Sequence, residues 1–175
     1  MIRHITPADY RKMPWANGKG VTVEMLKVEE GGHLLWRLSR ASVVENGDFS
    51  MFPGIERNLT VITGPGFDLI GDALHLHAKP LIPVAFAGDT PIRAEAVTAA
   101  SDDFNVMTAR HLKRPEVAVI TGEAQLRGGD MLAVFALTDG TLNGRAMRPY
   151  DMILTDEPAS VDGRMIAVRL YRSGA

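Results

Sequence analysis

The sequence predicts an all-β protein whose chain forms two similar β-barrel halves, packed as one compact unit. Three observations favour this fold. Helical periodicity is scarce, short extended segments recur between Gly, Pro and Asp residues, and one strand-and-turn pattern occurs twice. The 175 residues are enough for one domain of ordinary size with a sizeable core.

The first expected element is a very short helix near the start of the chain. Thr6 suits a helix N-cap, and Pro7 suits the first helical position. Because Met13-Pro14 follows closely, this helix is limited to a turn or two. The main extended runs are expected to be strands, and they cover residues 21–28, 34–44, 59–63, 104–108, 117–121, 131–137, 152–155 and 165–171.

An internal repeat suggests the two halves. The segment Val-Ile-Thr-Gly at 61–64 recurs at 119–122, an offset of 58 residues, and Gly-Asp and Leu residues recur downstream at the same offset. We therefore expect one half over residues 1–95, with the ligand pocket, and a second over 96–175. The alternative is that two common hairpins happen to look alike.

Composition excludes several classes of function. Lys and Arg number 19 against 21 Asp and Glu, and this near balance argues against binding to nucleic acid or to an anionic membrane. The lack of cysteine excludes disulfides, thiolate nucleophiles and Cys-ligated metals. The first residues lack a signal-peptide core, and the most apolar stretch, 81–87, is too short to span a membrane, so we expect a cytoplasmic protein.

Neither a metal site nor a catalytic nucleophile is indicated. His75 and His77 share one face of a strand, but no Glu follows before Glu95, and His111 lies far beyond. We therefore expect no metal and no cofactor. There is no Gly-x-Ser-x-Gly motif and no phosphate-binding loop, so the sequence names no reaction.

Polar residues on predicted strands are the remaining candidates. Arg37 and Ser39 share one face, as do Thr22 and Glu24, and a third such pair is Asn105 with Met107. An Arg inside a barrel either pairs with a carboxylate such as Glu24 or offers its guanidinium to a ligand carboxylate. It can also lie outside, facing solvent.

Four segments resemble one known family. The strand–Gly–strand rhythm is similar to that of cupins, and two copies are similar to a bicupin. More specifically, motifs of the HutD/Ves family are matched in order by the segments at residues 15–22, 36–39, 49–57 and 103–108. The family's Asn-Gly-Gly-Gly is Asn-Gly-Lys-Gly here, with Lys19, and its frequent Arg-Arg pair is Ala109-Arg110.

The resemblance implies a metal-independent bicupin associated with histidine utilisation. It would bind a small carboxylate metabolite of the formylated or formimino-glutamate type, and act in or regulate histidine catabolism. The expected ligand-binding residues are Trp15, Asn17, Thr22, Arg37, Ser39, Arg57, Asn105 and Met107. Phe49, Phe52 and Pro53 are expected to close the barrel or to form one pocket wall.

Other functions stay open. One is a hydrolase or isomerase acting on such an intermediate, with Glu24 as acid or base. A metal-dependent dioxygenase and a pure interaction module are weaker alternatives. We expect a small acidic metabolite as the partner, no nucleic acid and no membrane, and a homodimer is possible.

Overall fold

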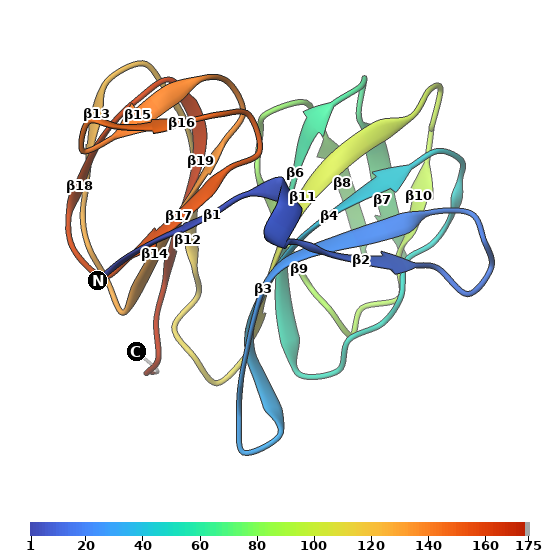
Figure 1. Cartoon of the computed structure of the whole chain (residues 1–175). Coiled ribbons are helices and arrows are strands. Elements are labelled where there is room, and N and C mark those ends of the chain that lie inside the picture. The colour runs from blue at the N-terminus through green and yellow to red at the C-terminus, as the bar shows by residue number, and fades with distance from the viewer. Residues whose placement is uncertain (174–175) are drawn as a thin grey trace. The chain divides into compact units, whose positions relative to one another are not determined.

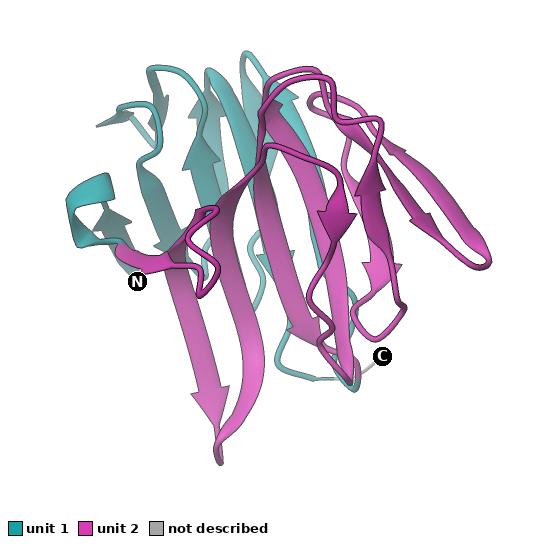
Figure 2. Cartoon of the chain, turned by 90° about the vertical axis from the view of Figure 1, so that its right-hand side faces the viewer, with its two compact units in different colours: residues 1–10, 111–175 teal, residues 11–110 magenta. Residues whose placement is uncertain are grey.

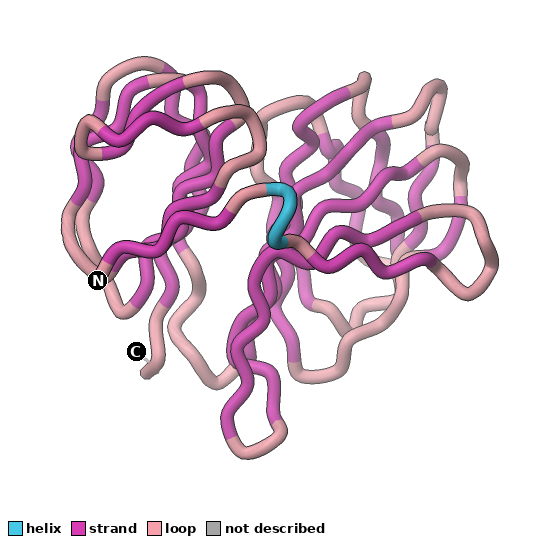
Figure 3. Tube along the Cα trace, viewed as in Figure 1, coloured by secondary structure: helices cyan, strands magenta, loops and turns pink. Residues whose placement is uncertain are grey.

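The computed structural model describes residues 1–173, which form mainly antiparallel β-strands (Figures 1 and 3). The all-β prediction is confirmed, and each of the eight main predicted strands is present. The expected short helix is a 3₁₀ turn, η1 (Pro7–Asp9). The backbone N–H and the hydroxyl of Thr6 both donate to Oδ2 of Asp9 over 2.8 Å, which holds the start of this turn.

The chain divides into two compact units, coloured separately in Figure 2. Unit 2 is residues 11–110, and unit 1 combines residues 1–10 with the chain from 111 onward. The expected division at residues 95 and 96 differs because β11 (Ser101–Ala109) pairs with strands of the first half, which keeps it in unit 2. Likewise β1 (Ile2–Ile5) pairs with β17 (Met152–Thr155), which places the start of the chain in unit 1.

Unit 2 contains a six-stranded and a four-stranded sheet. The six-stranded order is β2-β3-β4-β11-β6-β9, and the four-stranded order is β5-β10-β7-β8. The remaining bounds are β2 (Arg11–Pro14), β3 (Val21–Glu30), β4 (His33–Val43), β5 (Gly47–Asp48), β6 (Ile55–Thr63), β7 (Phe67–Gly71), β8 (Leu74–Ala78), β9 (Val84–Ala87) and β10 (Arg93–Glu95).

Unit 1 has a five-stranded sheet, β1-β17-β14-β19-β12, and a four-stranded sheet, β13-β18-β15-β16. The remaining bounds are β12 (Glu116–Thr121), β13 (Ala124–Leu126), β14 (Met131–Ala136), β15 (Gly140–Leu142), β16 (Arg145–Met147), β18 (Ala159–Asp162) and β19 (Arg164–Leu170). Among residues 1–173, no helix is long and apolar enough to cross a membrane.

The two units repeat one strand order. The order β4-β11-β6-β9 in unit 2 matches β12-β19-β14-β17 in unit 1, and the small sheets match as β5-β10-β7-β8 with β13-β18-β15-β16. The strands from β4 to β11 therefore recur, one for one, as β12 to β19.

This correspondence corrects the offset of the sequence repeat. The shift of 58 residues aligns β6 with β12, whereas strand order aligns β6 with β14. The shared Val-Ile-Thr-Gly marks a strand that ends in a glycine turn, where Gly64 and Gly122 have φ of 83° and 81°. Such a turn is needed wherever an extended strand doubles back, so it does not identify a position in the fold.

The core of unit 2 lies between its two sheets. Strand alternation sends Leu59 and Val61 of β6 and Leu69 of β7 into one buried cluster, to which β9 adds Phe86. This cluster supports one end of the inner face on which the polar residues of β4, β6 and β11 lie.

Candidate functional site

A cavity of about 660 Å³ lies in unit 2. The eight residues expected to bind ligand all line it: Trp15, Asn17, Thr22, Arg37, Ser39, Arg57, Asn105 and Met107. They come from β3, β4, β6, β11 and the segment between β2 and β3. The cavity therefore gathers the predicted residues in one place, and their contact with a ligand stays a prediction.

Strand register explains how the central residues meet. Met107 lies opposite Arg37 on β4 and opposite Arg57 on β6, so these three residues form one row across the sheet. Two positions earlier on β11, Asn105 lies opposite Ser39. Residues two apart on a strand share a face, so both rows line the same cavity.

Arg57 is the buried cation of this cavity, with only 8% of its surface exposed. Its Nη2 donates to Oδ1 of Asn105 over 3.1 Å, and its Nη1 makes a long bond of 3.4 Å to the carbonyl oxygen of Ser50. Its buried Nε has no hydrogen-bond partner among residues 1–173. The guanidinium therefore keeps hydrogen-bonding capacity that the described part of the chain does not use.

Three aromatic rings surround the same guanidinium. The Cζ atom of Arg57 lies 5.4 Å from the ring centre of Phe49, 5.3 Å from that of Phe52 and 5.1 Å from that of Phe86. Phe49 and Phe52 also line the cavity, as the pocket-wall alternative expected. The ring faces attract the cation and hold its plane in a largely apolar setting.

Asp103 is a buried carboxyl group, 2% exposed, that also lines the cavity. Burial raises the pKa of Asp103 to about 7, although a hydrogen bond from Asn105 and the charge of Arg57 partly oppose this shift. Burial also lowers the pKa of Arg57 to about 10, so Arg57 stays protonated at neutral pH. Asp103 is consequently ionised only in part at neutral pH, and compensates only part of the Arg57 charge.

Arg37 has a carboxylate partner. Its Nε donates to Oε2 of Glu24 over 2.8 Å, and the two side chains are 14% and 11% exposed. Of the two roles considered inside a barrel, the structure therefore shows the ion pair. Glu24 is not one of the described residues that line the cavity.

Trp15 is a half-buried residue of the cavity lining. Its indole Nε1 donates to the hydroxyl of Thr22 over 2.9 Å. A Cβ atom added to Gly20 would lie 2.8 Å from atoms of the Trp15 ring, so glycine is required for this packing. The Gly-Lys-Gly segment thus positions the tryptophan.

The two departures from the family pattern lie in different surroundings. Lys19 lines the cavity, and its Nζ pairs with Glu45 over 2.6 Å. Ala109, which stands at the first position of the Arg-Arg pair, is buried on β11 and is not among the described lining residues. The retained Arg110 bonds to Glu56 and Asp89 at 2.6 and 2.7 Å.

Asp103 is the principal cavity residue that sequence reasoning missed. In the sequence it begins the matched segment 103–108, and it precedes Asn105 and Met107 with the spacing of two that places strand residues on one face. None of the described lining residues is a histidine. His75 and His77 lie on β8, on the exposed face of the small sheet.

A repeated all-β strand order with a polar cavity in one unit defines this protein as a bicupin. A sequence profile of the HutD family matches residues 7–168, and the chain belongs to that family. It is 36% identical to Protein Ves of Cronobacter sakazakii over 152 residues, 81% of either chain. It is 35% identical over 125 residues to an uncharacterized 21.2 kDa protein in the hutC 3′ region of Pseudomonas putida, with 67% of this chain and 64% of that protein covered.

Solved structures agree with the family. HutD from Pseudomonas fluorescens superposes with a TM-score of 0.91 at 29% identity, covering 99% of this chain and 100% of that one. The bacterial pirin YhhW of Escherichia coli shares only the fold, with a TM-score of 0.65 at 7% identity over 97% of this chain and 99% of that one.

Proposed function

We propose that this HutD-family protein binds a small carboxylate metabolite in the unit 2 cavity and thereby acts in or regulates histidine catabolism. The family is linked to histidine utilisation through its HutD members and the relative in the hutC region. The ligand we propose is of the formylated or formimino-glutamate type. The observation that carries the proposal is the buried, under-bonded guanidinium of Arg57.

The surroundings of Arg57 favour an anionic ligand. Among residues 1–173, no carboxylate lies within 4.0 Å of the Arg57 guanidinium, and Asp103 reaches it only through Asn105. A buried cation without an adjacent anion is costly, and a ligand carboxylate would offset that cost with charge-assisted hydrogen bonds. The raised pKa of Asp103 supports the same conclusion, because a neutral Asp103 would not repel the incoming anion.

Uncharged polar groups around the arginine suit the rest of such a metabolite. Ser39 and Asn105 lie in the adjoining row of the sheet, and Asn17 and Thr22 line the cavity as well. Hydroxyl and amide groups can bond a formyl or formimino group without adding charge. The volume of about 660 Å³ is within the range of small-molecule sites.

We propose further that this binding requires no metal and that the protein is a binding protein rather than an enzyme. The cavity offers an arginine, amides and hydroxyls, which recognise a carboxylate directly. Glu24, the acid or base of the enzyme alternative, bonds to Arg37 and is not among the described cavity residues.

The test is a thermal-shift screen of chelator-treated protein against N-formylglutamate, formiminoglutamate, glutamate, histidine, urocanate and formate. A ligand present at about 100 times its dissociation constant stabilises the fold by roughly 2.7 kcal/mol, which is easily measured. Arg57→Lys keeps the charge but loses the planar fork, so we expect it to weaken binding at least about tenfold. Arg93→Lys, at an exposed position of β10, is the matched control and should bind as wild type.

Several outcomes would contradict the proposal. Wild-type affinity in both Arg57→Lys and Arg57→Gln would remove Arg57 from the site. A panel without any stabilising compound would argue against the proposed ligand class. Loss of a compound during incubation, followed by NMR, would favour the enzyme alternative, and turnover that survives Glu24→Gln would exclude Glu24 as its acid or base.

A further inference from the structure

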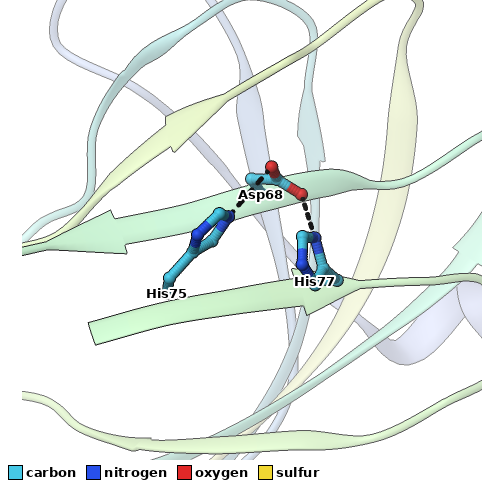
Figure 4. Close-up of side chains that lie close together, drawn as sticks. All are labelled: Asp68, His75 and His77. Atoms are coloured by element: carbon cyan, nitrogen blue, oxygen red, sulfur yellow. Dashed lines mark hydrogen bonds and ion pairs between the residues drawn. The ribbon is translucent and has the colours of Figure 1, made fainter.

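Three potential metal ligands meet on the exposed face of the β7–β8 hairpin (Figure 4). Nε2 of His75 lies 3.1 Å from Oδ2 of Asp68, and Nδ1 of His77 lies 2.7 Å from Oδ1 of the same carboxylate. Each residue offers one ligand atom, and these atoms all lie within 4.8 Å of one another. The sequence shows only the two histidines at ligand spacing, because the third residue precedes them on the neighbouring strand.

The hairpin register produces this group. Asp68 lies directly opposite His77, and the next pair along the same face is Ile70 with His75. The carboxylate thus faces one histidine across the strands and the other diagonally. Leu76 lies between the histidines and packs toward the core, so both rings point outward.

We propose that Asp68, His75 and His77 form a binding site for one divalent transition-metal ion of the zinc class. Two imidazole nitrogens and one carboxylate oxygen are ligands that Zn²⁺ accepts, at about 2.0–2.2 Å each. Ligand atoms around such an ion lie roughly 3–3.5 Å apart. The three candidate atoms already lie within 4.8 Å of one another, so the side chains would have to close only slightly around the ion. Mg²⁺ and Ca²⁺ prefer oxygen ligands, so this set disfavours both.

The group is open to solvent. The side chains of His75 and His77 are 53% and 59% exposed, so a hydrated ion can reach them, and its remaining positions would face water. On β10, the other neighbour of β7, Glu95 lies opposite Asp68. The carboxylate of Glu95 already bonds to Arg93 and Asn46.

This site is distinct from the arginine cavity. Ala94 of β10 lines the cavity, and Arg93 and Glu95 on either side of it point to the opposite face of the sheet. Glu95 shares that opposite face with Asp68. An ion held there would tie β7 to β8 and stabilise the hairpin, without entering the carboxylate site.

Titration calorimetry of tag-free, chelator-treated, metal-free protein with Zn²⁺ tests the proposal. We expect one equivalent of Zn²⁺ per chain, with affinity reduced at least about tenfold in Asp68→Asn and in His77→Ala. His33→Ala removes an exposed histidine of β4 in the same unit and should leave the affinity unchanged. Mg²⁺ should give no comparable heat.

A second measurement uses the wild-type protein and therefore does not depend on whether the variants fold. In NMR spectra of the wild-type protein, one equivalent of Zn²⁺ should shift the ring signals of His75 and His77, and leave those of His33 in place. The proposal is overturned by the absence of stoichiometric binding, by wild-type affinity in folded Asp68→Asn, or by equal shifts at all three histidines. The carboxylate screen is run in chelator, so its result is independent of this one.

Discussion

Arg57 and Asn105 are joined by a hydrogen bond of 3.1 Å, from Nη2 of the arginine to Oδ1 of the amide. The amide nitrogen of Asn105 donates in turn to Oδ1 of Asp103. A buried cation and a buried carboxyl group are thereby connected through a single side chain. This chain of contacts makes the protonation of Asp103 relevant both to stability and to binding.

The first prediction concerns stability between pH 5 and pH 8. Burial raises the pKa of Asp103 from 3.8 to about 7 in the folded state, so the folded chain binds more protons than the unfolded chain between these values. The contribution of Asp103 to stability must therefore fall as pH rises through this window, by roughly 2 to 3 kcal/mol from pH 5 to pH 8. Urea unfolding across this range measures the fall.

Asp103→Asn is the matching variant, because it keeps the shape and cannot ionise. Its free energy of unfolding should lack the Asp103 contribution, so the difference between the two proteins should grow with pH in favour of the variant. Other carboxylates titrate in both proteins and cancel in this difference. A difference that stays constant from pH 5 to pH 8 would contradict the raised pKa.

The second prediction concerns Gly20, whose missing side chain makes room for Trp15. In Gly20→Ala the new Cβ atom would lie 2.8 Å from the ring, which must then move. We expect the fluorescence of Trp15 to shift to longer wavelength and the carboxylate ligand to bind more weakly. The other tryptophan, Trp36, is fully buried, so the change in emission reports on Trp15.

Gly47→Ala is the control for this variant. Gly47 also lines the cavity, but an added Cβ atom would meet nothing within 4 Å. Its emission should match that of the wild type. Equal behaviour of the two variants would show that the contact between Gly20 and Trp15 does not shape the site.

The third prediction concerns the ion pair between Arg37 and Glu24. Both side chains are largely buried and their bond is 2.8 Å long, so a double-mutant cycle with Arg37→Gln and Glu24→Gln should give a coupling energy of about 1–3 kcal/mol. The exposed pair Arg93 and Glu95, at 2.7 Å, serves as the reference. Its coupling should lie at about 0–1 kcal/mol. Equal couplings, measured by urea unfolding, would contradict a structural role for the buried pair.

Most of the sequence-based predictions rested on patterns among residues that are close together in the chain. The alternation of polar and apolar residues around Arg37 and Asn105 indicated strands with one polar face, and the structure places both residues on the same cavity. The repeat showed that local patterns are insufficient for register, because its offset of 58 residues pairs β6 with β12 rather than β14. A glycine turn looks the same at the end of any strand.

Sequence alone determined the all-β class, the main strands and the polar residues that share a strand face, such as Arg37 with Ser39, because these depend on side-chain period and on turn residues a few positions apart. Tertiary structure decided which distant strands pair, and hence that Arg37 bonds to Glu24 while Arg57 meets Asn105. It also raised the pKa of Asp103 and brought Asp68 beside His75 and His77. The physical reason is that desolvation and cross-strand contact depend on neighbours in space, which the order of residues along the chain does not specify.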